Sequence, residues 1–137
     1  MGDFDAGPYS ALVAELVERR FLVLGDSRDD ERFGNSLLLL RRGATRLRVV
    51  RDRSQWFLEI AGPGSDDWFG PAVWLAMLDD GLPPAEQLSH DQQANFVLHR
   101  LPELDRVSAD DSGRSIELLR TWQAQRAASR RAQPPGT

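Results

Sequence analysis

The sequence contains no cysteine and no lysine, and only two of its 137 residues are histidine. Without cysteine the chain forms no disulfide, no thiolate metal site and no cysteine nucleophile. No apolar run approaches the roughly 20 residues that a membrane-spanning helix needs, and the N-terminal residues are acidic where a secretory signal is basic and then apolar. These absences predict a cytoplasmic protein that does not interact with a membrane.

The charge balance is acidic, with 17 basic residues, all arginine, and a formal net charge of −4. Non-specific binding to nucleic acid gains its affinity by neutralising many phosphates, so we expect no nucleic-acid partner. Hydrophobic residues make up 41% of the chain and charged residues 28%, which is typical of a globular protein. The length predicts one domain, which we place at residues 1–128, followed by a frayed tail at residues 129–137.

Helical spacing of apolar residues appears before and after a central region rich in β-branched and leucine residues. Residues 8–20 predict an amphipathic helix whose inward side chains include Val17. Three more helices are predicted at residues 71–80, at residues 89–101 behind a capping box, and from about residue 111 onward. Pro102 is expected to kink or interrupt the second of these, Asp111 to cap the third, and Ile116, Leu119 and Trp122 to face inward.

The central region predicts a short edge strand at residues 21–25, an exposed polar loop from Asp26, and two successive hairpins within residues 35–61. A turn at Gly43 and Ala44 pairs Leu40 with Leu47. A second turn at Asp52 and Arg53 then pairs Leu47 with Leu58, Val49 with Trp56, Arg46 with Glu59 and Arg48 with Phe57.

These registers divide the side chains of the sheet between two faces. We expect helices to seal the apolar face, which carries Leu38, Leu40, Leu47, Val49, Trp56, Leu58 and Ile60. We expect the opposite face to stay open, because it mixes apolar and charged residues: Leu37, Leu39, Arg41, Arg46, Arg48, Val50, Gln55, Phe57 and Glu59. The sequence thus predicts an α+β fold, in which an N-terminal helix precedes an antiparallel meander of three to four strands and three helices pack on one sheet face.

No motif for catalysis or metal binding is present. His90 and His99 lie nine positions apart and do not form a zinc-binding HExxH pair, GxSxG is absent, and GPGS lacks the phosphate-binding glycine patterns. We therefore expect no metal, no cofactor and no catalytic residue, and we classify the protein as not an enzyme. A Ser-His-acid triad assembled in space stays an open alternative, because triads do not follow chain order.

Pairs of acidic residues recur in the predicted loops and helix ends, and two aromatic residues follow one of these pairs. Loop acids can form a rim that meets a basic partner and speeds its capture. Trp68 and Phe69 either fill the core at the edge of the sheet or anchor a protein interface. The acidic residues are Asp26, Asp29, Asp30, Glu31, Asp66, Asp67, Asp79, Asp80, Asp110 and Asp111.

Three sequence features lie within residues 34–80: the segment FGN before the strands, the hairpin VVRDRSQWFLEI, and DWF before a short apolar helix. This region, about a third of the chain, resembles small actinobacterial immunity proteins of polymorphic toxin systems. The resemblance implies a cytoplasmic, non-enzymatic protein that binds a cognate toxin domain and blocks its active site. It assigns no role to any single residue.

Our first hypothesis is therefore a protein that occludes a toxin domain, with acidic side chains pairing to the cationic groups of a basic, nuclease-like toxin. The predicted contacts are Asp29, Asp30, Glu31, Asp66, Asp67 and Trp68, and the open face offers an alternative surface at Arg46, Arg48, Phe57 and Glu59. Charge reversal of Asp66 and Asp67 together is expected to weaken binding without lowering the melting temperature much.

Two further hypotheses belong to other classes of protein. The second is a small-ligand or enzyme domain with a pocket between sheet and helices, where Arg41, Arg46 or Arg48 holds an anionic group. The third is a chaperone or adaptor that binds a secreted effector by adding a strand to an exposed sheet edge. The second hypothesis predicts arginines that converge on an open pocket. The third predicts a sheet edge that is exposed and unpaired.

Overall fold

The computed structural model describes residues 6–29, 35–81 and 88–132, and within these it describes no side chain for residues 26–29, 35 and 130–132. The elements follow in the order η1 (Gly7–Tyr9), α1 (Ser10–Glu18), β1 (Leu22–Asp29), β2 (Asn35–Arg42), β3 (Thr45–Asp52), β4 (Gln55–Ala61), β5 (Trp68–Phe69), α2 (Pro71–Asp79), α3 (His90–His99), α4 (Leu101–Ser108) and α5 (Arg114–Ala132). This order confirms the predicted α+β class.

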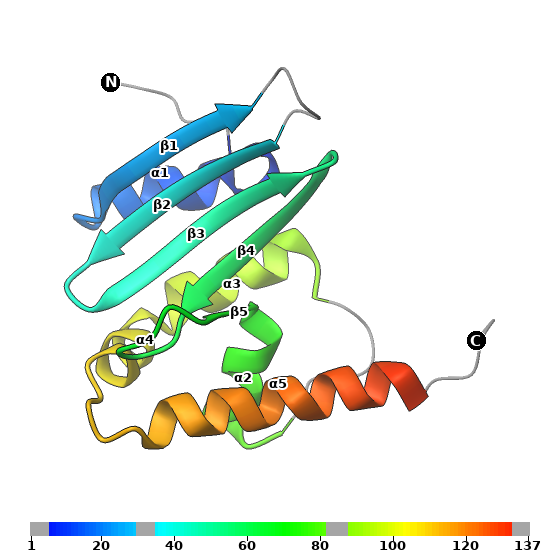
Figure 1. Cartoon of the computed structure of the whole chain (residues 1–137). Helices are drawn as coiled ribbons and strands as arrows, with labels where there is room; N and C mark the ends of the chain where they lie inside the picture. The colour runs from blue at the N-terminus through cyan, green and yellow to red at the C-terminus, as the bar shows by residue number, and fades with distance from the viewer. Residues whose placement is uncertain (1–5, 30–34, 82–87, 133–137) are drawn as a thin grey trace.

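The strands form one antiparallel sheet in the sequential order β1-β2-β3-β4-β5. Figure 1 shows this sheet from its uncovered face, with α1 and α3 behind it and with α2 and α5 beyond the β4 edge. The fifth strand has only two residues and pairs Phe69 with Ile60. α1 and α3 therefore cover one face of the sheet, as the hydrophobic pattern predicts, and α2 and α5 extend past the β4 edge.

The first hairpin has the predicted register, and the second does not. Leu40 pairs with Leu47 around a turn in which Gly43 has a φ of 59°. The second turn lies at Arg53 and Ser54, one residue later than predicted, so Leu47 pairs with Ile60. Arg53 and Ser54 both have positive φ, at 52° and 71°, which is the conformation that two-residue hairpin turns require. Neither residue is glycine or asparagine, so the sequence carries no usual signal for this turn.

The corrected register leaves the two faces unchanged. The pairing partners on β4 are offset by two residues, and side chains alternate between faces with a period of two. Leu58 and Ile60 are buried as predicted, and Trp56 is half-buried against the core. Gly7 lies directly against the Trp56 indole, where a Cβ would come within 2.3 Å of the ring. The division into a covered and an open face therefore holds.

The first strand extends further than its apolar residues indicate. β1 continues through Asp26 to Asp29 and pairs with β2 along that length, so the exposed loop predicted from Asp26 is wrong for these residues. The ladder contains an irregularity between Val23 and Gly25. Main-chain pairing with β2 decides the length of this strand, because the ladder hydrogen bonds do not depend on the polarity of the side chains.

The N-terminal helix buries Tyr9, Leu12, Val13 and Leu16 as predicted. Val17 is 42% exposed, so its predicted inward orientation is wrong. At about 100° per residue, Val17 lies roughly 90° from the centre of the buried stripe, beyond the part that meets the sheet.

The later helices confirm most of the predicted boundaries. The capping box is present, with Ser89 Oγ accepting from the Gln92 backbone N–H at 3.1 Å and Gln92 Oε1 accepting from the Ser89 N–H at 2.8 Å. Pro102 lies in the first turn of α4, where its missing N–H costs nothing. α3 ends at His99 and α4 begins at Leu101, so of the two predicted outcomes the interruption is confirmed and no kink forms. Ile116 and Leu119 are buried, and Trp122 packs partly against the core.

The beginning and end of α5 differ from the prediction. Asp110, and not Asp111, accepts the hydrogen bonds that precede the helix, from the backbone N–H groups of Ser112 and Ser115. The helix continues to Ala132, into the region where a frayed tail is predicted. The predicted tail beyond residue 132 lies outside the described residues.

Candidate functional site

The uncovered face of the sheet, called the open face below, is ordered in rows that cross the strands. Leu37 of β2, Val50 of β3 and Phe57 of β4 form one such row. Leu37 and Val50 are partly exposed, and Phe57 is 44% exposed. This row presents a continuous apolar stripe, with one large aromatic side chain, to the outside of the molecule.

The neighbouring row carries a charge pair that is already satisfied. Arg48 pairs across the strands with Glu59, and its Nε donates a hydrogen bond to Glu59 Oε1 at 2.8 Å. The Arg48 guanidinium also lies over the Trp68 ring, with Cζ 4.4 Å from the ring centroid. Trp68 is therefore half-buried beneath an arginine, and Phe69 is fully buried. The structure thus brings together three predicted contact residues, Arg48, Glu59 and Trp68.

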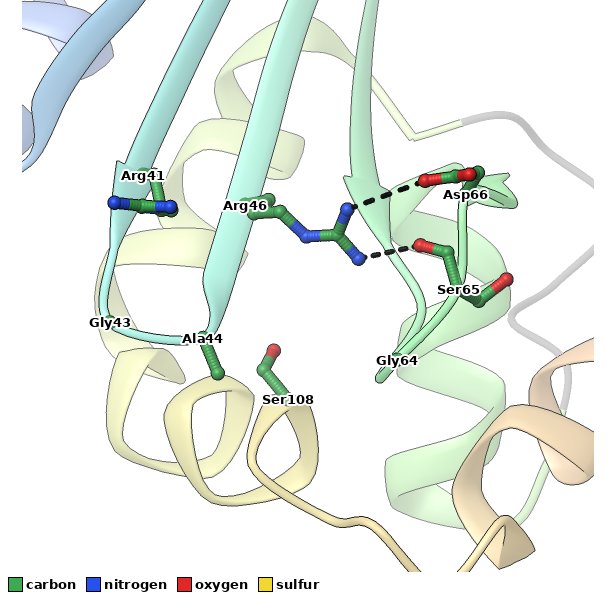
Figure 2. A pocket seen from close by; sticks show the side chains of 8 residues that line it. All are labelled: Arg41, Gly43, Ala44, Arg46, Gly64, Ser65, Asp66 and Ser108. Carbon is green, nitrogen blue, oxygen red and sulfur yellow. Dashed lines mark hydrogen bonds and ion pairs between the residues drawn. The ribbon is translucent and has the colours of Figure 1, made fainter.

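The third row holds two arginines that face each other across β2 and β3, Arg41 and Arg46. Figure 2 shows Arg46 reaching toward the loop after β4. Its Nη2 donates to the carbonyl oxygens of Gly62 at 3.2 Å and Ser65 at 2.5 Å. Its Nη1 lies 3.9 Å from Asp66 Oδ1, which is longer than a hydrogen bond.

Arg41 differs from the other two open-face arginines. Its side chain is exposed, and within the described parts of the chain it has no hydrogen-bond or ion-pair partner. Thus the three arginines of this face range from fully paired Arg48, through partly paired Arg46, to unpaired Arg41.

A shallow pocket of about 400 Å³ lies between these arginines, the β2–β3 turn and the loop after β4, and is called the Arg41 pocket below. Figure 2 shows it, with Arg41, Ala44, Arg46, Ser65, Asp66 and Ser108 around it. Ser108, the last residue of α4, is only 5% exposed. Its Oγ is buried and has no hydrogen-bond partner among the described residues, so the hydroxyl is unsatisfied.

A polar cluster explains why α4 reaches this pocket. Asp105 of α4 accepts a hydrogen bond from Arg42 Nη2 at 2.6 Å and another from Thr45 Oγ1 at 2.5 Å. Both donors flank the β2–β3 turn, and Thr45 is buried. This cluster holds the end of α4 against the turn and places Ser108 at the side of the pocket. No sequence pattern indicates these long-range contacts.

The predicted acidic contacts do not gather at one place. Asp66 is fully exposed beside Arg46, whereas Asp67 pairs with Arg120 of α5 at 2.9 Å. The Asp67 carboxylate raises the pKa of Arg120 above its usual value. Asp29 lies in β1, but its side chain is not described, and Asp30 and Glu31 lie outside the described residues. Whether these acids meet a partner stays a prediction.

A second, larger cleft of about 730 Å³ lies between the β4 edge, the first turns of α2 and α3, and α5. Tyr9 is buried at its wall and donates a hydrogen bond to Gln93 Oε1 at 2.7 Å. Burial raises the pKa of Tyr9 to about 12, against a smaller opposite effect of the Leu58 backbone. Arg126 is the arginine that lines this cleft, and Arg41, Arg46 and Arg48 do not line it. The arginines named in the second hypothesis therefore lie outside this cleft, and two of them, Arg41 and Arg46, line the Arg41 pocket.

The outer edge of β1 pairs with no described strand, and Leu22 and Leu24 are exposed on it. This is the feature that strand addition requires. The register irregularity between Val23 and Gly25 interrupts the regular spacing of that edge, as bulges on protected edges do. We therefore regard the open face as the better candidate surface.

Other classes of site find no support in the part of the chain that the structure describes. No group of three or more histidine, aspartate or glutamate side chains there could hold a metal ion. No described helix is both long enough and apolar enough to cross a membrane. Comparisons of the chain with protein-family models, with curated proteins and with solved structures found no match. The functional proposal therefore rests on the open face and its pocket.

Proposed function

We propose that this chain is a non-enzymatic, cytoplasmic immunity protein that binds a cognate toxin domain through the open face and blocks the toxin active site. The observation that carries the proposal is the row of Leu37, Val50 and Phe57, which no described helix covers, beside a row of charged residues. Interfaces combine an aromatic or arginine anchor with surrounding contacts that exclude water. The resemblance of residues 34–80 to immunity proteins supports the same class.

The open face is suited to steric occlusion because its side chains are held before a partner arrives. Arg48 is fixed by Glu59 and Trp68, and Arg46 is fixed by two carbonyl oxygens. Side chains that are ordered in the free protein lose little conformational entropy on binding. Phe57 then supplies apolar area, and the rigid sheet around it keeps substrate out of the toxin active site.

Truncation of Phe57 tests this surface. Phe57→Ala should weaken binding of the proposed cognate toxin domain at least about tenfold, or about 1.4 kcal/mol, because anchors in an interface carry most of the binding energy. Affinity is measured by calorimetry, and protection by growth of cells that express the toxin.

Val17→Ala is the matched control, because Val17 is 42% exposed on α1, behind the sheet, against 44% for Phe57. Both variants should retain the melting temperature of the parent within a few degrees. Equal affinities of the Phe57→Ala and Val17→Ala variants would remove the open face from the interface.

A small-ligand domain is the second candidate function, favoured by the unpaired Arg41 and by the two cavities. Such a domain would bind an anionic compound without any protein partner. Saturable binding of a small anion by a chain that binds no toxin domain would favour this candidate.

A further inference from the structure

We propose that the Arg41 pocket is a carboxylate site that receives an aspartate or glutamate side chain of the partner protein. This assignment rests on the proposed docking of a partner on the open face, to which Arg41 and Arg46 belong. Three observations carry it: two arginines opposite each other, a loosely bound internal carboxylate, and a buried hydroxyl without a partner.

The first observation concerns the two positive charges. Arg41 and Arg46 occupy directly opposite positions on β2 and β3, an arrangement in which like charges repel. Arg41 has no acceptor within the described residues, and Arg46 Nη2 uses only carbonyl oxygens. Figure 2 shows Arg46 directed toward the loop after β4 and Arg41 over β2, and both line the pocket. An oxyanion in this pocket would reduce the repulsion and accept charge-assisted hydrogen bonds.

The second observation concerns Asp66, whose carboxylate lies 3.9 Å from Arg46 Nη1. This distance is too long for a hydrogen bond, and the Asp66 side chain is fully exposed. The Asp66 carboxylate therefore lies at the acceptor position beside Arg46 without forming a hydrogen bond to it. A partner carboxylate would displace Asp66, so Asp66 acts as an internal competitor.

The third observation concerns Ser108, whose Oγ is buried with no partner in the described structure. An unsatisfied buried hydroxyl is unfavourable, and it is relieved when a ligand supplies an acceptor. Ser108 lines the same pocket as the two arginines, from the opposite side. It can therefore donate a third hydrogen bond to a bound carboxylate after a small side-chain rotation.

The surroundings favour a carboxylate presented by a protein over a free phosphate. The carbonyl oxygens of Gly62 and Ser65 and the Asp66 carboxylate lie beside the arginines, and they repel a dianion more than a monoanion. The pocket is also wide open to solvent, so it covers the tip of a side chain but does not enclose a whole small molecule.

The test uses the full chain labelled with ¹⁵N and glutamate blocked at both ends, whose only charge is the side-chain carboxylate. Inorganic phosphate and sodium chloride at matched ionic strength are the comparison arms. Blocked glutamate should produce saturable shifts at the Gly43, Ala44, Ser65 and Ser108 amides, with a roughly millimolar dissociation constant. Chloride should produce no saturable shift at these amides.

Four variants define the residues involved. Arg41→Gln should weaken blocked-glutamate binding about fivefold and Ser108→Ala about twofold, because each removes a donor. Asp66→Asn should strengthen it about threefold, because the competitor loses its charge. Arg53→Gln, at the other end of β3, removes the same charge and should leave binding unchanged.

The outcomes separate this site from the proposed function. Three results would each overturn the carboxylate site. Chloride could reproduce the shifts, the Arg41 and Arg53 variants could lose the same blocked-glutamate affinity, or the Asp66 variant could bind blocked glutamate more weakly than the parent. Phosphate binding more than about tenfold tighter than glutamate would assign the pocket to a free phosphate. Loss of toxin binding in Phe57→Ala with no blocked-glutamate binding in the parent leaves the proposed function standing and rejects the site. Blocked-glutamate binding in the parent with no loss of toxin binding in Phe57→Ala confirms a carboxylate-binding pocket and rejects docking of the toxin on the open face.

Discussion

At the scale of single residues, the partner of a side chain decides its role more than its chemical type does. Arg48, Arg46 and Arg41 lie on the same face, yet one is fully paired, one is partly paired and one is unpaired. Their common position on the open face follows from the alternation of side chains along a strand. Their different availability follows from Glu59 and from the loop after β4, which the sequence around each arginine does not reveal.

Asp110 gives a pH-dependent prediction at this scale. Hydrogen bonds from Ser115, and then from Ser112, lower the pKa of Asp110 below its usual value of 3.8. Because the folded pKa is depressed, the stabilisation is complete above pH 3.8 and is lost as the pH falls below that value. Asp110→Asn should therefore lower the free energy of unfolding at pH 7. On acidification, that free energy should fall less in the variant than in the parent.

The measurement is the urea midpoint of the parent and of the variant at pH 7 and pH 3. Asp111→Asn is the control, since it removes the neighbouring carboxylate, which forms no hydrogen bond with the described residues. If the two variants change the pH dependence equally, the hydrogen bonds of Asp110 do not account for the effect.

At the scale of elements, the two hairpins show how turns select a register. Gly43 adopts a φ of 59° without steric cost, and the turn was predicted correctly. Arg53 and Ser54 also have positive φ, and because each carries a Cβ they incur a steric cost that glycine would avoid. Local turn preference therefore does not select this register. The offset of two residues keeps Leu58 and Ile60 on the covered face in both the predicted and the observed register, so the alternation of side chains does not select it either.

Reciprocal substitutions at these turns test this account. Ser54→Gly should raise the free energy of unfolding and Gly43→Ala should lower it, each by roughly 1 kcal/mol, because positive φ favours glycine. A Cβ at Gly43 meets no atom within 4 Å, so the effect there is conformational and not steric. Chemical denaturation measures both changes, and changes of the same sign in the two variants would contradict the account.

At the scale of the whole molecule, the net charge and the open face would affect binding of the proposed toxin separately. We expect the formal charge of −4 to speed the approach of a basic partner, and the open face to form the contacts once the two proteins meet. The fully exposed Asp66 contributes to the field, whereas Asp67 also ties the loop after β4 to α5 through Arg120.

Charge reversal of Asp66 and Asp67 together therefore acts mainly on the association rate. The double Asp→Lys variant brings the formal charge from −4 to zero, since each substitution adds two positive charges. Toxin association should slow severalfold at low salt and lose its salt dependence, with little change in dissociation. Stopped-flow kinetics at several salt concentrations measures both rates.

The two single reversals separate steering from stability. Asp66→Lys should leave the melting temperature unchanged, and Asp67→Lys should lower it slightly because Arg120 loses its ion pair with Asp67 and keeps only the one with Glu117. An unchanged association rate in the double variant would show that these acids neither steer nor contact the toxin.

The sequence by itself determined where the main strands and helices lie along the chain, which face of the central strands is apolar, and where the capping box lies, because these properties depend on periodicity and on neighbours a few positions away. Only the tertiary structure decided the register of the second hairpin, the pairing of Arg48, Arg46 and Asp67, and the burial of Ser108. Those properties depend on contacts between residues far apart in the chain, such as Asp105 with Arg42 and Thr45, which no local pattern encodes.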